Sequence, residues 1–482
     1  MKALTIILLL SVATLTFAQP PDTLWTRTYG GTSCDYAYSV QQTTDGGYIM
    51  AGVTSSFGAG AGDFYLVKTN SQGDRLWTRT YGGNLLDYAT SVQQTTDSGF
   101  IVAGYTESFG VDYQDFYLVK TNSQGDTLWT RTYRGRCWEE ANSVQQTTDG
   151  GYIIAGNTVP FSASNSEFFV VKTNSQGDTL WTRTYGGSEW DCANSVQQTT
   201  DGGYIVAGIT YSFGAGSGDF YLVKTNSQGD RLWTRTYGGI NWDNASSVQQ
   251  TTDGGYIVAG YTEFFSSSDF YLVKTDSQGD TLWTRAYEGS DLLNRAFSVQ
   301  QTTDGGYIIA GYTQSFFASN SDICLVKTNC WGDLCWTGNY GRGHNFDEAY
   351  SVQQTSDGGY IVAGVTRGIG VGSVDFYLVK LGAESSVEPI SLLLPLRYSL
   401  HPNYPNPFNP STRISYDLPS PGSVTLEIFD LLGRRVASLA KGTQSAGTYS
   451  ILFNGFDLPS GLYFYRLHAG TFIQIQKMVL LK

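Results

Sequence analysis

The sequence predicts an all-β protein, in which a seven-bladed β-propeller is followed by a small immunoglobulin-like β-sandwich. The first observation behind this prediction is a motif, SVQQT(T/S)D(G/S)G(Y/F), that recurs at steps of 52, 52, 52, 52, 51 and 53 residues. It begins at Ser39, Ser91, Ser143, Ser195, Ser247, Ser298 and Ser351. The second observation is that each repeat holds four strand-like runs, as a propeller blade does. The third is that the array begins and ends on different strand types.

The N-terminal residues predict a secretory signal peptide. Lys2 supplies the positive end, Leu4 to Phe17 form the apolar run, and small residues precede the expected cleavage after Ala18. The run is shorter than the roughly 20 residues of a membrane-spanning helix. We therefore expect an exported chain that does not span the membrane. The predicted boundaries are 1–18 for the signal peptide, 19–382 for the propeller, 383–395 for a linker and 396–482 for the β-sandwich.

The four runs of a repeat follow one another in a fixed order. SVQQT and YIVAGYT are joined by a turn such as Asp253-Gly254-Gly255, whose glycine supplies the positive φ of a tight hairpin. DFYLVKT and LWTRTY are joined by a second glycine-containing turn, Asn226 to Asp230. LWTRTY alternates, with Trp233, Arg235 and Tyr237 on one face. YIVAG and FYLVK do not alternate, which is typical of strands covered on both faces.

The ends of the array predict a closed ring. The first repeated element is an LWTRTY strand at Leu24 to Tyr29, and the last is a DFYLVK strand at Asp375 to Lys380. The N-terminal strand can therefore complete the seventh blade, which leaves no unpaired strand edge. An open stack of repeats would need atypical capping units. After residue 396, strand-like runs at 423–429, 448–453, 461–467 and 471–481 predict the β-sandwich.

Composition excludes several classes of protein. The net charge is −13 and only 15% of the residues are charged, so we expect no nucleic-acid partner. With three histidines and no CxxC pair, we expect no metal site and no cofactor. The six cysteines do not recur at one repeat position, and the only pair we propose is a disulfide between Cys330 and Cys335 across a hairpin. We expect a monomer.

The connections between strands predict where a ligand binds. The DGG and NSQGD turns share one face of the ring and barely vary, whereas the connections on the other face vary in sequence and length. Candidate ligand-binding residues in these variable connections are the aromatic Trp138, Trp190, Trp242, Phe57, Phe109, Phe161, Phe213 and Phe316. These aromatics suit stacking on sugars or contact with a protein. The alternative for the phenylalanines is that each caps the apolar gap between blades.

An acidic residue recurs two positions before an alanine in the variable connections. The set is Asp35, Asp87, Glu139, Asp191, Asp243 and Asp347. These carboxylates either attract a cation or accept backbone hydrogen bonds within their own loops, as aspartates in turns do. The sequence names no catalytic residue, because no acid–base pair that breaks the repeat converges on one place.

Two resemblances complete the sequence analysis. The YGG…DYA…DGGYIVAG repeats resemble seven-bladed propeller repeats of exported bacterial proteins. YPNPFNP (404–410), IFDLLGRRV (428–436), LPSGLYFYRL (458–467) and KMVLLK (477–482) resemble the type A C-terminal sorting domain of type IX secretion substrates, and part of this pattern also occurs in an immunoglobulin-like domain of flagellar hook-cap proteins. The sorting-domain resemblance implies recognition by outer-membrane secretion machinery, cleavage of the tail, and release or attachment to the outer surface of a Gram-negative cell.

The sequence therefore predicts a secreted or cell-surface propeller that acts as a binding or adhesion module. The alternative is a secreted polysaccharide hydrolase or lyase with its site on the variable face. A pair of carboxylates about 5–10 Å apart beside an open groove would favour the enzyme.

Overall fold

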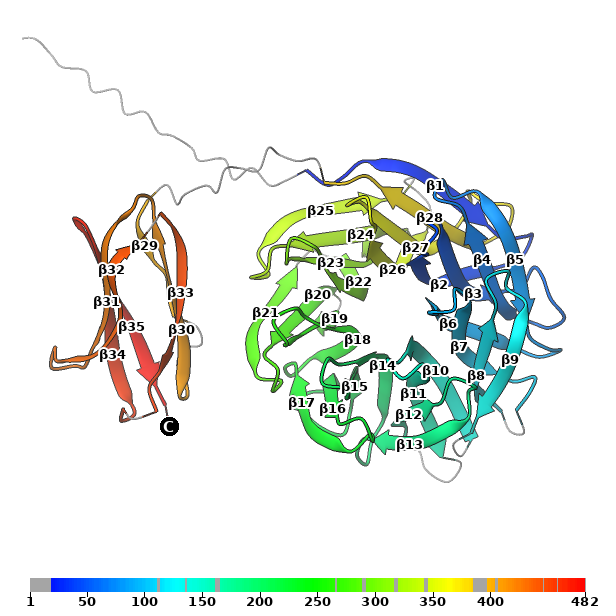
Figure 1. Cartoon of the computed structure of the whole chain (residues 1–482), viewed down its shortest axis with the longest axis horizontal. Helices are drawn as coiled ribbons and strands as arrows, with labels where there is room; N and C mark the ends of the chain where they lie inside the picture. The colour runs from blue at the N-terminus through cyan, green and yellow to red at the C-terminus, as the bar shows by residue number, and fades with distance from the viewer. Residues whose placement is uncertain are drawn as a thin grey trace, which may run out of the picture. The chain divides into compact units, whose positions relative to one another are not determined.

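The computed structural model describes residues 19–481 except 111–112, 135–136, 161–164, 265–266, 288–291, 316–319, 342–345, 385–396, 404–405, 445 and 457. The predicted signal peptide lies outside the described residues. The chain divides into two compact units between residues 385 and 386, and each is described here by itself. The first unit is a ring of seven blades (Figure 1). The described part of the chain contains no helix long and apolar enough to cross a membrane.

Each blade contains four antiparallel strands that are arranged in order from the centre of the ring outward. A single parallel pair, Ser268 with Leu293, joins the sheets of blades 5 and 6. The innermost strands of blades 1 to 7 are β2 (Asp35–Gln42), β6 (Asp87–Gln94), β10 (Cys137–Gln146), β14 (Asp191–Gln198), β18 (Trp242–Gln250), β22 (Leu292–Gln301) and β26 (Asp347–Gln354). The second strands are β3 (Tyr48–Thr54), β7 (Phe100–Thr106), β11 (Tyr152–Pro160), β15 (Tyr204–Thr210), β19 (Tyr256–Phe264), β23 (Tyr307–Ser315) and β27 (Tyr360–Thr366). The third strands are β4 (Asp63–Thr69), β8 (Asp115–Thr121), β12 (Glu167–Thr173), β16 (Asp219–Thr225), β20 (Ser267–Thr275), β24 (Ser321–Thr328) and β28 (Asp375–Leu381). The outer strands are β5 (Arg75–Tyr81), β9 (Thr127–Tyr133), β13 (Thr179–Tyr185), β17 (Arg231–Tyr237), β21 (Thr281–Tyr287), β25 (Leu334–Tyr340) and β1 (Thr23–Tyr29).

The cores lie between the blades. Strands such as β3 and β4 are buried along their whole length, as their lack of alternation predicts. One cluster joins Tyr48, Met50 and Tyr65 of blade 1 to Phe376 and Leu378 of blade 7. Six further clusters of the same kind occupy the other blade boundaries. Each blade thus buries both of its faces against its neighbours.

The outer strands hold each blade to the turn of the next one. Trp77 packs edge-on against Phe100, with ring centroids 5.8 Å apart, and Arg79 lies over the Trp77 ring. The Tyr81 hydroxyl donates a hydrogen bond of 2.6 Å to the carbonyl oxygen of Gly125 in the next blade. The alternation of LWTRTY therefore directs these three side chains across the blade boundary, as predicted.

The ring closes as predicted through the N-terminal strand. β1 pairs antiparallel with β28 and forms the outer strand of blade 7 (Figure 1). Blade 7 has no turn between its third and outer strands, because β28 and β1 come from opposite ends of the repeat array in the sequence. The Tyr340 hydroxyl accordingly donates to the carbonyl oxygen of Pro21 at 3.0 Å, in place of the turn glycine used elsewhere.

A buried lysine holds the DGG-type turn of every blade. In blade 4, Lys224 is buried and its Nζ lies 2.9 Å from a carboxylate oxygen of Asp201. The Asp201 carboxylate also accepts hydrogen bonds from the Thr199 hydroxyl and the Gly203 N–H. Burial alone would raise the pKa of Asp201, but these hydrogen bonds and Lys224 outweigh it and lower the pKa to about 2. The other six blades contain the equivalent ion pair.

The structure corrects the predicted disulfide, since Cys330 and Cys335 both have free thiols. The strand register gives the physical reason. The pair nearest the turn between β24 and β25 is Thr328 with Leu334, and the next is Lys327 with Trp336. Cys335 occupies the intervening bulge and Cys330 lies in the turn, so the two residues are not cross-strand partners.

The C-terminal unit packs two sheets against each other. Its strands are β29 (Ser399–Leu400), β30 (Ser411–Leu418), β31 (Gly422–Phe429), β32 (Arg435–Gln444), β33 (Gly447–Asn454), β34 (Gly461–Ala469) and β35 (Phe472–Leu480). The sheet orders are β29-β30-β33 and β32-β31-β34-β35. Ile414, Tyr416, Leu426 and Tyr465 are among the core residues. The proline-rich segment is fixed to the last strand, because the Phe408 N–H donates to the Val479 carbonyl oxygen at 2.9 Å.

Deleting residues Asp22 to Tyr29 should unfold or aggregate the propeller. The deletion removes β1 and leaves the edge of β28 and one inter-blade core unpaired. Thermal melting monitored by circular dichroism checks this expectation. Deletion of Gln19 and Pro20 is the matched control, and a melting temperature that stays unchanged after the longer deletion would contradict the closure.

Replacing Asp201 by Asn should lower the free energy of unfolding at pH 7 by about 1–3 kcal/mol, because Lys224 stays buried and loses its charged acceptor. Since the folded pKa of Asp201 lies below its unfolded value near 3.9, the stabilisation is present above about pH 4. It is lost as the pH falls toward about 2. Urea unfolding of both chains from pH 7 to pH 2 should show the difference shrinking with acidification. A constant difference would contradict this account.

Candidate functional site

The two faces of the ring carry different connections. Because the blades are antiparallel, the turns after the first and third strands lie on one face, which we call the constant face. These turns are closed by repeated backbone hydrogen bonds, such as Thr43 N–H to Gly47 O at 2.9 Å and Asn70 N–H to Asp74 O at 3.0 Å. The loops after the second strands and the crossings to the next blade lie on the other face, which we call the variable face. The predicted ligand-binding residues that the structure describes belong to the variable face.

The recurring carboxylates of the variable face are buried and bonded within their loops. The Asp35 carboxylate accepts hydrogen bonds from the Gly31 N–H and the Ser56 hydroxyl, both at 2.8 Å, and from the Thr54 hydroxyl. Asp87, Glu139, Asp191, Asp243 and Asp347 are likewise buried. The described residues contain no group of three or more side chains placed to hold a metal ion. For Asp35, these are the bonds that the loop-structuring alternative predicts.

A second carboxylate from the preceding blade lies beside several of these residues. Asp219 opens β16 and Asp243 belongs to blade 5, and both approach Gly238. Burial raises the pKa of Asp219, and the charge of Asp243 raises it further. A Cβ at Gly238 would lie 2.5 Å from a carboxylate oxygen of each aspartate. The first glycine of the YGG motif therefore makes room for a buried acidic pair.

The phenylalanines pack on their own blades but remain partly exposed. Phe57 lies 5.6 Å from the ring of Tyr65, Phe109 lies 5.3 Å from Tyr117, and Phe213 lies 5.4 Å from Tyr221. Each of the three is more than 40% exposed. They cover the tyrosines at the blade boundaries and still present an edge to solvent. Phe161 and Phe316 lie outside the described residues.

The three tryptophans occupy equivalent positions in blades 3, 4 and 5. Trp138 is 49% exposed and Trp190 is 46% exposed, whereas Trp242 is half-buried against Tyr261. Their loops are fixed by backbone hydrogen bonds. The Glu139 N–H donates to Gln114 O of the preceding blade at 3.0 Å, and the Trp190 carbonyl accepts from Tyr211 at 2.9 Å. Trp138 and Trp190 are thus exposed on backbone that is hydrogen-bonded to neighbouring segments.

Sequence reasoning missed two exposed tyrosines on this face. Tyr113 precedes β8, and its ring centroid lies 5.9 Å from that of Trp138. Tyr211 follows β15 and is also exposed. Neither residue recurs at an equivalent position, so only their departure from the repeat could have identified them. They extend the exposed aromatic surface across blades 2 to 4.

Sequence reasoning also missed an asymmetric belt on the inner strands, formed by the residues that flank the repeated alanine. Over blades 6, 7, 1 and 2 this belt is aromatic, with Tyr38 lying 5.1 Å from both Tyr88 and Tyr350. Over blades 3 and 4 it is polar, where Asn142 and Asn194 donate to carbonyl oxygens of the next blade at 2.8 Å. An alignment of the seven repeats would have found these positions, because they vary inside an otherwise constant strand.

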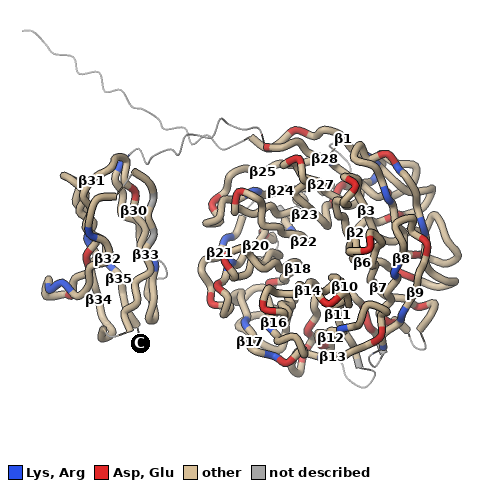
Figure 2. Tube along the Cα trace, viewed as in Figure 1, with Lys and Arg blue, Asp and Glu red and all other residues tan. Residues whose placement is uncertain are grey.

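Charged residues of both signs are spread over the described part of the propeller. Acidic residues recur around the whole ring, and Lys and Arg are interspersed with them (Figure 2). Most outer-strand arginines pair with an aspartate of the next blade, as Arg79 does with Asp126 at 3.3 Å.

Comparison with known proteins assigns the tail. Residues 403–481 match the family described as "Secretion system C-terminal sorting domain". The chain is therefore a type IX secretion substrate, and it is delivered to the cell surface or the exterior of a Gram-negative bacterium. The class of protein that fold and tail define is an exported β-propeller.

Other similarities are distant. The chain is 25% identical over 259 residues to the regulatory protein FlaEY of Caulobacter vibrioides, which covers 46% of this chain and 26% of that protein. The chain thus spans about a quarter of the length of this curated relative. Among solved structures it is similar to PorZ, an essential surface component of the type IX secretion system of Porphyromonas gingivalis. The TM-score is 0.44, the identity is 11%, and the match covers 94% of this chain and 60% of PorZ. The Pyrococcus horikoshii acylaminoacyl peptidase matches with a TM-score of 0.42 at 9% identity, over 80% of this chain and 59% of that one.

Replacing Gly238 by Ala should destabilise the propeller by about 1–3 kcal/mol, because the new methyl group meets two carboxylates and the backbone φ of +150° disfavours a side chain. The neighbouring Gly239 is the matched control, since a Cβ there meets nothing within 4 Å. Urea unfolding of both variants measures the effect. Equal stability of the two variants would show that the acidic pair does not constrain this loop.

Proposed function

We propose that the exported propeller is a carbohydrate-binding module that holds its ligand on the variable face. The observation that carries this proposal is the exposure of Trp138 and Trp190 on adjacent blades. Exposed aromatic side chains that gather on one face of a soluble protein commonly mark a binding site. Tyr113 and Tyr211 enlarge the same surface. Planar aromatic rings on fixed backbone suit the flat apolar faces of sugars.

The alternative of a polysaccharide hydrolase or lyase receives less support from this geometry. Glycosidases use two carboxyl groups beside an open groove. The close carboxylates of the variable face, such as Asp219 and Asp243, are buried and occupied by backbone N–H groups. Asp219 also lines a pocket on the protein surface, but one oxygen of each carboxylate is already occupied by a loop N–H.

A glycan array probed with the full-length chain should give a defined set of bound sugars, and calorimetry with one of these sugars then tests the site. Trp138→Ala and Trp190→Ala should each weaken binding about tenfold, because truncating an aromatic anchor in an interface commonly costs more than about 1 kcal/mol. Trp331→Ala is the matched control. Trp331 is also 49% exposed but belongs to a turn of the constant face.

Two results would contradict the proposal. An array without bound glycan would remove carbohydrate as the ligand class and leave a protein partner as the candidate. Equal weakening by Trp331→Ala would remove the variable face as the location.

A further inference from the structure

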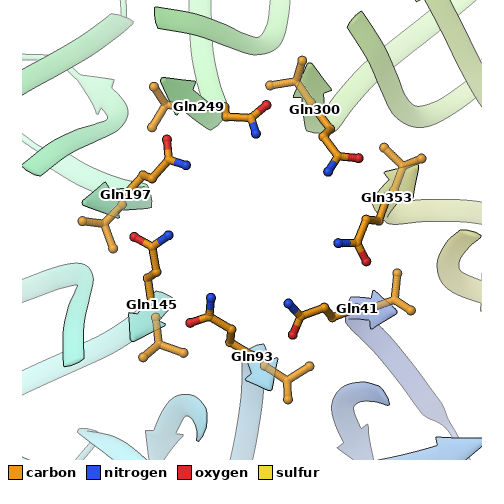
Figure 3. A pocket seen from close by; sticks show the side chains of 14 residues that line it. Gln41, Gln93, Gln145, Gln197, Gln249, Gln300 and Gln353 are labelled. Atoms are coloured by element: carbon orange, nitrogen blue, oxygen red, sulfur yellow. The ribbon is translucent and has the colours of Figure 1, made fainter. Parts of the chain in front are cut away.

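The central channel of the propeller is lined by the same two residues from every blade. The first glutamine of each SVQQ motif faces the axis, together with the preceding valine. The seven glutamines are Gln41, Gln93, Gln145, Gln197, Gln249, Gln300 and Gln353 (Figure 3). The lined part of the channel has a volume of about 250 Å³, which equals roughly eight water molecules at about 30 Å³ each.

The orientation of each side-chain amide is fixed by the neighbouring blade. Gln145 Oε1 accepts a hydrogen bond of 2.6 Å from the backbone N–H of Gln198. The other six glutamines make the equivalent bond to the next blade, also at 2.6 Å. An amide NH₂ group donates hydrogen bonds and cannot accept one, so the side-chain oxygen must face the backbone N–H. The nitrogen of each side chain therefore points toward the axis, as Figure 3 shows.

The channel consequently presents one kind of polar group. Each Nε2 carries two N–H donors, and these seven nitrogens make no hydrogen bond to the part of the chain that the structure describes. The remaining lining is valine, so neither a carboxylate nor a cationic side chain belongs to the lined segment. A ring of N–H donors at the axis, with each amide oxygen bonded to a backbone N–H, favours a ligand that accepts hydrogen bonds. Hydrogen bonds to such a ligand are strongest when it is ionised.

We propose that the channel binds a small oxyanion, of the class of sulfate or phosphate, through the seven Gln Nε2 groups. The oxyanion lies on the axis and accepts hydrogen bonds from the amides directly or through water, because both kinds of bond are of comparable strength. The volume leaves room for the ion with part of its hydration shell. This site is separate from the aromatic surface of the variable face and does not depend on the function proposed for it.

Titration calorimetry of the full-length chain with sodium sulfate and with sodium phosphate, in chloride-free buffer, tests the site. The informative variant is Gln145→Glu. Its carboxylate keeps an oxygen for the Gln198 N–H and replaces the axial donor by a negative oxygen. Sulfate binding should weaken about tenfold or more because like charges repel across the channel.

The matched control is Gln146→Glu, which adds the same charge one residue away. Gln146 does not line the channel, and its Oε1 accepts the Thr96 N–H at 2.9 Å. Its anion affinity should stay within twofold of the wild type. Gln249→Glu repeats the test in another blade if the first variant is poorly folded by circular dichroism. Absence of anion binding to the wild-type chain up to about 10 mM, or equal loss in the Gln146→Glu control, would overturn the proposal.

Discussion

The structure depends on one constraint, which is that a blade cannot bury its own faces. The second and third strands of every blade are apolar on both sides, and their side chains reach their packing partners only in the adjacent blades. A ring satisfies this requirement for all blades at once, whereas an open array would leave two apolar faces in water. The pairing of β1 with β28 therefore completes the last of these boundaries as well as adding a strand.

The polar residues of the repeat follow from the same constraint. A strand order that crosses from one blade to the next leaves backbone N–H groups and turn carbonyls at every boundary, and buried groups of this kind require partners. The serine of SVQQ accepts the Val N–H of the next blade, as Ser39 does for Val92. The outer tyrosine donates to the next turn, and the buried lysine satisfies the turn aspartate within its own blade. The polar residues that recur in every repeat are therefore those that form hydrogen bonds between and within blades.

We expect ligand binding where hydrogen bonding between blades constrains the amino-acid sequence least. The variable-face loops also form hydrogen bonds across blade boundaries, as Glu139 does with Gln114. Their sequences nevertheless differ most from blade to blade, and Trp138 and Trp190 are exposed there. The channel shows the opposite case, because its glutamines are constant for structural reasons and each leaves one unused amide nitrogen. Because the repeat occurs seven times, these amide nitrogens form a ring of hydrogen-bond donors (Figure 3). The C-terminal unit contributes export and is built separately, around its own core.

The sequence alone determined the number of blades, the four strands of each, the closing strand and the sorting tail. The blades, their strands and the closing strand follow from periodicity and from local turn chemistry, which nearby residues specify. The sorting tail follows from short motifs that resemble those of a known family, such as residues 404–410. Tertiary structure decided the rest, since it depends on contacts far apart in the chain. The bulge at Cys335 separates two cysteines that lie close in sequence. The role of Asp243 follows from its approach to Asp219 across a blade boundary. The orientation of the Gln145 amide could not be predicted from the sequence either, because the N–H that fixes its oxygen belongs to a residue 53 positions later.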